Sequence, residues 1–266
     1  MEKRGQVTTF IILGIVLIIV VALIYFARSE LGVGRPKQEF LDIQLRSIQD
    51  EVNRCVDERV PQGLKLFGLQ GGTLKPASYK LYQGNQVQYL CSNIPNDAMC
   101  LNLLKPLGNY EDELNKYAEF ELNNCLDPNK FKGLFGSYEI SIGSLKVDID
   151  LEDEKALVNV DYPVTLSKGD ARPVNLPRIT RSIEAPIGGL YKDTYQIING
   201  YASTGDFLHE AYMFSKRGEV EIKRDTVYPD IIFILNKKNS DYVFQFAIEG
   251  EEERVKWTRK QQKEWL

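Results

Sequence analysis

The first thirty residues hold the longest apolar stretch of the chain. No charged residue lies between Val7 and Ala27, a run of 21 residues. As an α-helix this run is about 31 Å long, close to the ~30 Å hydrocarbon core of a bilayer. The pattern predicts a transmembrane helix within residues 1–30. A cleaved secretory signal is the alternative, but its apolar region is usually only ~7–15 residues and ends at a small-x-small site, whereas YFARSE follows here.

An amphipathic helix is predicted after a short glycine hinge at residues 31–35, LGVGR. Pro36 suits the first position of a helix. One apolar stripe then follows at helical spacing, and its members are Leu41, Leu45, Ile48, Val52 and Cys55. Pro61 and Gly63 predict that this helix ends or kinks near Val60. The stripe packs either on its own domain, which we favour, or on a partner helix.

The remainder of residues 36–135 reads as a helical, disulfide-bearing subdomain that contains a β-hairpin. The segments YKLYQG and QVQYLC alternate apolar and polar residues around a Gly-Asn pair, which is typical of a hairpin. A helix is then predicted from a cap at Asn109 to Cys125. Its first turn is acidic, and the helix dipole favours acids there.

Residues 136–250 predict an antiparallel β-meander with helices. Period-2 alternation predicts three successive paired strands from Tyr138 to Leu166, with EDEK as the turn between the last two. Arg172–Glu184 is interrupted by proline and predicts an edge strand.

Helical spacing then predicts a helix over IGGLYKDTYQIINGYAS, whose shared face is Leu190, Tyr191, Thr194, Ile197, Ile198 and Tyr201. TGDFLHEAYMFSKRG predicts a second, short helix capped by Thr204 or Asp206. DIIFILN and DYVFQFAIEG predict two strands of a hairpin, and residues 251–266 a C-terminal helix or tail. The expected fold class is therefore α+β: an N-terminal transmembrane helix, then helices packed on antiparallel β-sheet.

Charge and cysteine content narrow the setting. The net charge is −4, so the chain lacks the basic footprint of a nucleic-acid-binding protein. All four cysteines follow the apolar run, and four cysteines allow three pairings. Disulfides persist only in oxidising compartments, so they favour an extracytoplasmic location for the C-terminal part. Four buried free thiols are the alternative.

Candidate chemistry is sparse. His209 lies near Asp206 and Glu210, but no second histidine exists to complete a metal site or a triad. A row of acids, which are Asp148, Asp150, Glu152, Asp153 and Glu154, lacks the spacing of a calcium-binding loop and reads as a solvated face. We therefore predict no catalytic, cofactor-binding or metal-binding residue, and no enzymatic activity.

The N-terminal motif KRGQVTTFIILG resembles the class III signal peptides of archaeal pilins and archaellins. The resemblance makes Lys3 and Arg4 the basic pair and Gly5 the residue before a cleavage site. Gln6 would then be the first residue of the mature chain. Pilin-like subunits usually carry a glutamate at the fifth mature position, and Phe10 stands there in this chain. That departure argues against filament assembly.

A second resemblance covers more of the chain. The matching pieces are Gly5–Ile15, Cys55, Gly63–Gly72, Cys125 and Val158–Leu166. Together they resemble an uncharacterised family of single-pass, membrane-anchored extracytoplasmic proteins of DPANN archaea. The resemblance implies one bridge between Cys55 and Cys125 and a local one between Cys91 and Cys100.

We therefore expect a cell-surface protein with a structural or adhesive role and no cofactor. Its expected partners are the bilayer, through Val7–Ala27, and envelope proteins, other surface proteins or further copies of itself. The alternative is a pilin-like subunit of an extracellular filament, cleaved before Gln6.

Overall fold

The structure is a computed structural model that describes residues 5–30, 38–95, 99–127, 129, 131, 138–169 and 172–250. It confirms the predicted α+β class. The helices are α1 (Gly5–Glu30), α2 (Gln38–Leu69), α3 (Leu107–Cys125), α5 (Ile187–Thr204) and α6 (His209–Ser215). The strands are β1 (Tyr79–Tyr82), β2 (Asn85–Asn93), β3 (Cys100–Asn102), β4 (Glu139–Ile142), β5 (Lys146–Leu151), β6 (Ala156–Asp161), β7 (Val164–Ser167), β8 (Val174–Asn175), β9 (Ile179–Ile183), β10 (Val220–Val227), β11 (Asp230–Lys237) and β12 (Val243–Ile248).

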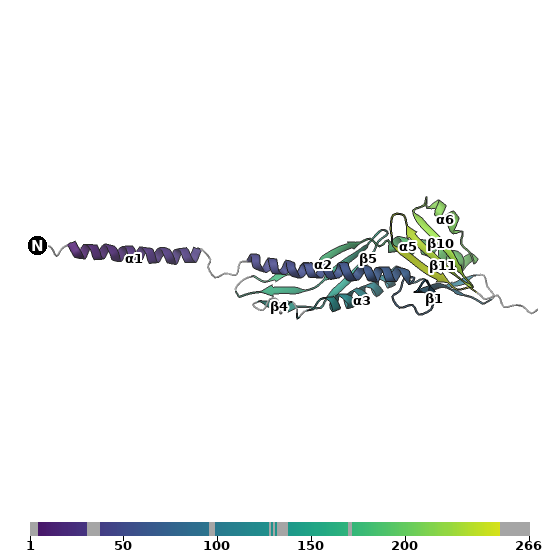
Figure 1. The fold of residues 1–266 in the computed structure, drawn as a ribbon, viewed down its shortest axis with the longest axis horizontal. Coiled ribbons are helices and arrows are strands. Elements are labelled where there is room, and N and C mark those ends of the chain that lie inside the picture. The colour runs from purple at the N-terminus through teal and green to yellow at the C-terminus, as the bar shows by residue number, and fades with distance from the viewer. Residues whose placement is uncertain are drawn as a thin grey trace, which may run out of the picture.

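The apolar N-terminal segment forms helix α1, which lies well apart from the other described elements (Figure 1). Within the described part of the chain, no helix combines the length and the apolar character that a membrane crossing requires. The predicted hinge at 31–35 and the C-terminal segment 251–266 lie outside the described residues, as do Lys3 and Arg4.

Helix α2 is longer than its sequence predicts. It continues through Pro61 to Leu69, so the prediction that it ends near Val60 is wrong. A proline inside a helix removes one backbone hydrogen bond, but the buried stripe continues past it with Leu64 and Phe67. A Cβ at Gly63 would collide with the Tyr117 ring, so the missing side chain lets α3 pack closely. Tertiary packing therefore outweighs the local break.

The predicted starts of two helices are also wrong. Helix α3 begins at Leu107 behind Pro106, and not at a side-chain cap on Asn109. Helix α6 begins behind Leu208, and neither Thr204 nor Asp206 caps it. Both starts lack a side-chain cap hydrogen bond, so packing sets where these helices begin.

The region from β4 to β9 forms a ribbon of three long antiparallel segments. The predicted pairing of β4 with β5 is wrong, because β4 pairs with β7 whereas β5 pairs with β6. One sheet has the strand order β4-β7-β8 and the other the order β5-β6-β9. The three segments β4–β5, β6–β7 and β8–β9 therefore each contribute one strand to each sheet. Pro163 and Pro177 lie where two of the segments are interrupted, and proline donates no hydrogen bond to a ladder. The hairpin at EDEK is confirmed, and so is the edge strand predicted within residues 172–184.

Helix α3 closes the outer edge of β5 with its side chains. The backbone N–H groups of Val147, Ile149 and Leu151 donate to Glu119, Asn115 and Glu111, at 3.1, 2.7 and 3.0 Å respectively. Residues four positions apart in a helix are separated by about 6 Å along its axis. Residues two positions apart in a strand are separated by about 6.6 Å, so the two spacings match. The helix thus replaces a fourth strand.

The remaining strands form the far sheet, of order β1-β2-β12-β11-β10, with β3 paired to β2. The predicted hairpins β1–β2 and β11–β12 are confirmed, whereas the parallel pairing of β12 with β2 has no counterpart in the prediction. Helix α5 contacts this sheet and buries the predicted Leu190, Thr194, Ile197, Ile198 and Tyr201, whereas Tyr191 of the predicted face is only half-buried. One continuous apolar core joins α2, α3, the ribbon, α5 and the far sheet.

Candidate functional site

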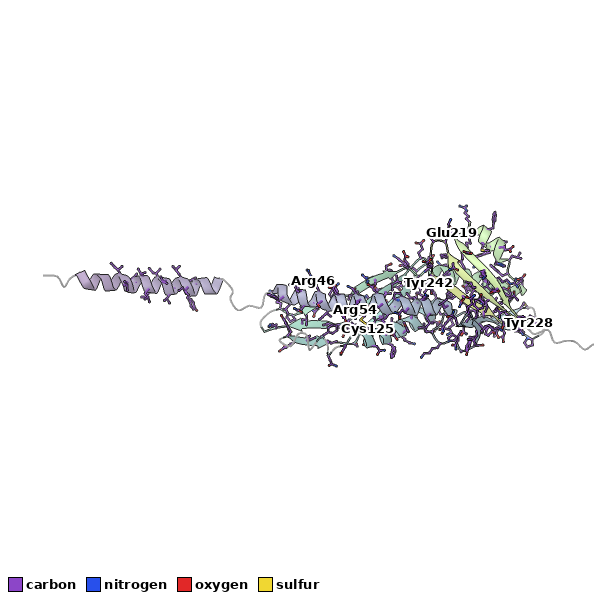
Figure 2. All side chains as sticks on the ribbon, viewed as in Figure 1. Arg46, Arg54, Cys125, Glu219, Tyr228 and Tyr242 are labelled. Atoms are coloured by element: carbon purple, nitrogen blue, oxygen red, sulfur yellow. A yellow bond between two sulfur atoms is a disulfide. The ribbon has the colours of Figure 1, made fainter. Side chains whose placement is uncertain are left out.

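Two disulfides join the four cysteines, which confirms the prediction of disulfide bonds. Cys55 of α2 is bonded to Cys125 at the end of α3, with Cα atoms 6.0 Å apart. Cys91 of β2 is bonded to Cys100 of β3, with Cα atoms 5.5 Å apart. This pairing is the one that the family resemblance implies. Figure 2 shows Arg54 and Cys125 close together midway along α2.

The other residues singled out in the sequence do not come together as one site. His209 opens α6, and its ring meets Phe233 edge-on, while Asp206 faces Arg224 at 3.6 Å. Asp148 and Asp150 lie exposed on β5, and Glu152, Asp153 and Glu154 lie in the turn after it. Among the residues that the structure describes, no cluster of three or more His, Cys, Asp or Glu side chains could hold a metal ion.

A polar cleft of about 660 Å³ lies where the ribbon meets the far sheet. Four parts of the chain form it: the β5–β6 turn, the start of α5, the end of α6, and the turn between β11 and β12. Glu219, labelled in Figure 2, is one of its lining residues. Its charged lining residues are Asp153, Glu154, Glu184, Lys192, Asp193, Lys216, Glu219, Lys237 and Lys238.

The cleft is organised around a buried carboxylate, Asp193, whose side chain is fully shielded from solvent. Lys237 Nζ lies 2.7 Å from one of its oxygens, and Lys216 Nζ lies 3.5 Å from the other. The Tyr212 hydroxyl donates a third contact at 2.8 Å. Burial and the neighbouring Asp193 carboxylate raise the pKa of Tyr212 well above its ordinary value, so the hydroxyl stays protonated and donates. A buried charge requires such pairing.

Two glycines at the start of α5 let this helix pack directly against the β5–β6 turn at the cleft. A Cβ at Gly188 or Gly189 would run into the backbone of the β5–β6 turn, so only glycine allows this approach. The Gly188 N–H donates to the Glu152 carbonyl at 3.1 Å. Lys192 of α5 forms an exposed salt bridge to Asp153 at 2.6 Å. The ribbon and the far sheet are thus held at fixed separation around the cleft.

Five carboxylates and four ammonium groups line the cleft, so its charges nearly balance. The two lysines at Asp193 are partly buried, whereas Glu154, Glu184 and Glu219 are exposed. Neither histidine nor cysteine is among its described lining residues. This arrangement suits a polar or bipolar surface group, held by charge and hydrogen bonding.

Sequence reasoning missed Asp193, although a signal was present. Asp193 lies three residues after Leu190 and four before Ile197, on the apolar face of α5. An acid inside such a face must find a cation when it is buried. The sequence does not show which cation, because Lys216 and Lys237 come from other elements.

No family model, curated protein or solved structure matches this chain.

Proposed function

We propose that the protein is a single-pass, membrane-anchored surface protein. In this proposal α1 is the anchor, and the folded domain lies outside the cytoplasm and binds other surface components. The observation that carries the proposal is the exposure of the apolar side chains of α1. Thirteen large apolar side chains between Ile12 and Phe26 are 47 to 76% exposed. Placing them in an apolar environment is favourable by on the order of 20 kcal/mol.

The sequence supports lipid as that environment. The structure describes α1 side chains from Ile12 to Phe26, and the uncharged run extends further, from Val7 to Ala27. The full run matches the thickness of a bilayer core. Apolar residues point in every direction around this helix, which is typical of a helix surrounded by lipid and not of one on a soluble core.

The disulfides support an extracytoplasmic domain. Both pairs are closed in the structure, and free thiols would be expected in a reducing cytoplasm. The cleft is also well placed for contact with partners. Tyr242, two residues after the cleft residue Ser240, donates to the Leu64 carbonyl of α2 at 2.8 Å. Leu64 is about 40 Å along α2 from its first residue, so the cleft lies far from the attachment of the anchor.

The test is extraction of membranes with alkaline carbonate. The full chain should stay in the membrane pellet, and a variant with Ile15→Arg and Ile19→Arg should be released, because charge inside a bilayer core costs about 3 kcal/mol per residue. The matched control is Phe120→Arg with Phe214→Arg, two exposed positions outside α1, and it should stay in the pellet. Release of the unmodified chain would contradict the anchor.

A pilin-like subunit is the second candidate, because Lys3, Arg4, Gly5 and Gln6 resemble a class III processing site. The apolar surface of α1 would then pack in a filament core. N-terminal sequencing of the mature protein separates the two: a chain that begins at Gln6 and sediments as filaments supports the subunit, and a chain that retains Lys3 supports the anchor.

A further inference from the structure

The start of α2 exposes two large apolar side chains. Phe40 and Ile43 are 54% and 51% exposed, although Leu41 beside them is fully buried. Residues three apart share a side of a helix, so these two side chains lie together on the outer face of α2. The buried stripe of the helix faces the domain core, so this outer pair stays about half exposed on the opposite side.

The same outer face changes character further along the helix. About two to four turns after Ile43 it carries Asp50, Arg54 and Glu58, and Arg54 forms salt bridges to Glu51 at 2.9 Å and to Glu58 at 2.7 Å. Phe40 and Ile43 are therefore exposed apolar residues at the start of this face, with the exposed Asp42 and Arg46 close by and charged residues beyond them.

The apolar pair is also the part of α2 nearest to α1 along the chain. Seven residues separate the end of α1 at Glu30 from the start of α2 at Gln38, and a segment of that length spans at most about 25 Å. A chain anchored by α1 therefore holds Phe40 and Ile43 near the bilayer surface. Arg46, also exposed, lies at the same end of α2 (Figure 2), where an arginine meets lipid phosphates well.

We propose that the start of α2 docks on the membrane that holds α1, with Phe40 and Ile43 inserted among the lipid headgroups and Arg46 at their phosphates. The proposal rests on the proposed function, because it requires the anchor. In this arrangement the end of the domain at the start of α2 faces the bilayer, and the far sheet and the cleft are directed away from the lipid. A freely swinging domain would present the cleft in every direction.

The experiment uses the full chain in lipid nanodiscs made with brominated acyl chains, which quench nearby tryptophan. Trp257 and Trp265 are first replaced by Phe, and Phe40→Trp then supplies the only tryptophan. We expect its emission to be quenched relative to nanodiscs with ordinary lipid, and its emission maximum to be blue-shifted relative to that of a water-exposed tryptophan. The matched probe is Phe120→Trp on α3, which is 64% exposed and should show neither change. Its neighbour Glu121 faces Arg59 of α2, about 29 Å along the helix from Phe40.

The outcomes separate the two proposals. If the chain enters nanodiscs and the Phe40→Trp probe is quenched no more than the Phe120→Trp probe, the docking is overturned and the anchor stays in place. Equal, strong quenching of both probes also overturns it, since the domain would then lie flat. A chain that does not enter nanodiscs overturns both proposals. In the supporting case, replacing Ile43 by Ser in the Phe40→Trp chain should reduce the quenching, whereas Phe214→Ser should not.

Discussion

The two N-terminal helices use their apolar residues in opposite ways. Helix α2 buries one stripe, including Ile48, Val52 and Val56, and its exposed side is mostly polar and charged beyond Phe40 and Ile43. Helix α1 has apolar residues on all sides, and its described side chains remain exposed. The difference shows that apolar content alone does not place a helix in a core. The angular distribution of apolar residues indicates whether the partner of a helix lies on one side or all around it.

The largest expected effect comes from placing a charge in each helix. Val52→Asp should lower the free energy of unfolding of the domain by on the order of 5 kcal/mol, because it buries a carboxylate without a cation. Ile18→Asp should leave domain stability unchanged and weaken only membrane insertion. Thermal melting of the detergent-solubilised full chain, followed by near-UV circular dichroism, measures the Tm of both variants. An equal drop in Tm for the two variants would show that α1 packs in the domain.

The next largest effect concerns the disulfide that joins α2 to α3. Replacing Cys55 and Cys125 by Ser opens a loop of 70 residues and should cost about 4 kcal/mol of stability. Replacing Cys91 and Cys100 by Ser opens a loop of only 9 residues and should cost about 2.5 kcal/mol. Chemical denaturation measures both changes. The reverse order would mean that loop length does not govern the stabilisation.

Alkaline pH tests the core without involving α1. Burial raises the pKa of Tyr201 to about 12, against ~10 in an unfolded chain. The unfolded state therefore loses this proton first, so the stabilisation is complete below pH ~10 and is lost as the pH rises toward 12, by roughly 2 kcal/mol. Tyr201→Phe should remove that part of the loss, and its effect at pH 7 should be small because the hydroxyl has no hydrogen-bond partner among the described residues. An unchanged alkaline profile in this variant would contradict the assignment.

The smallest effect comes from the edge of β5. Asn115→Ala removes the acceptor of the Ile149 N–H and should cost about 1 to 2 kcal/mol. Asn115→Asp keeps an acceptor at the same place and should cost less. Asn123→Ala, an exposed position on the same helix, is the matched control. Equal stability of the Asn115→Ala and Asn123→Ala variants, measured by denaturation, would show that the helix does not replace a strand there.

Most local features of this fold were predictable, except where the helices begin, and nonlocal pairings were not. The buried face of α5 and the hairpin β11–β12 follow from periodicity and turn residues close together in the sequence. The parallel pairing of β12 with β2 joins segments that lie far apart in the chain, and no local pattern encodes it. Pro61 shows the converse case, in which a correct local rule is overridden by packing around Leu64 and Phe67.

The cleft shows the same limit for a site. Its lining residues come from four parts of the chain that only the fold brings together. Asp193 alone carried a signal, as an acid on an apolar helix face, whereas Lys216 and Lys237 look like ordinary surface lysines in the sequence.

The most direct test of the anchored, outward-facing arrangement is labelling of intact cells with an amine reagent that does not cross membranes, followed by mass spectrometry of the membrane-extracted protein. The exposed lysines Lys116, Lys192 and Lys238 belong to the domain, and Lys3 precedes the apolar run. Our account predicts labelling at the three domain lysines and none at Lys3. Labelling at Lys3 with the domain lysines protected would contradict it.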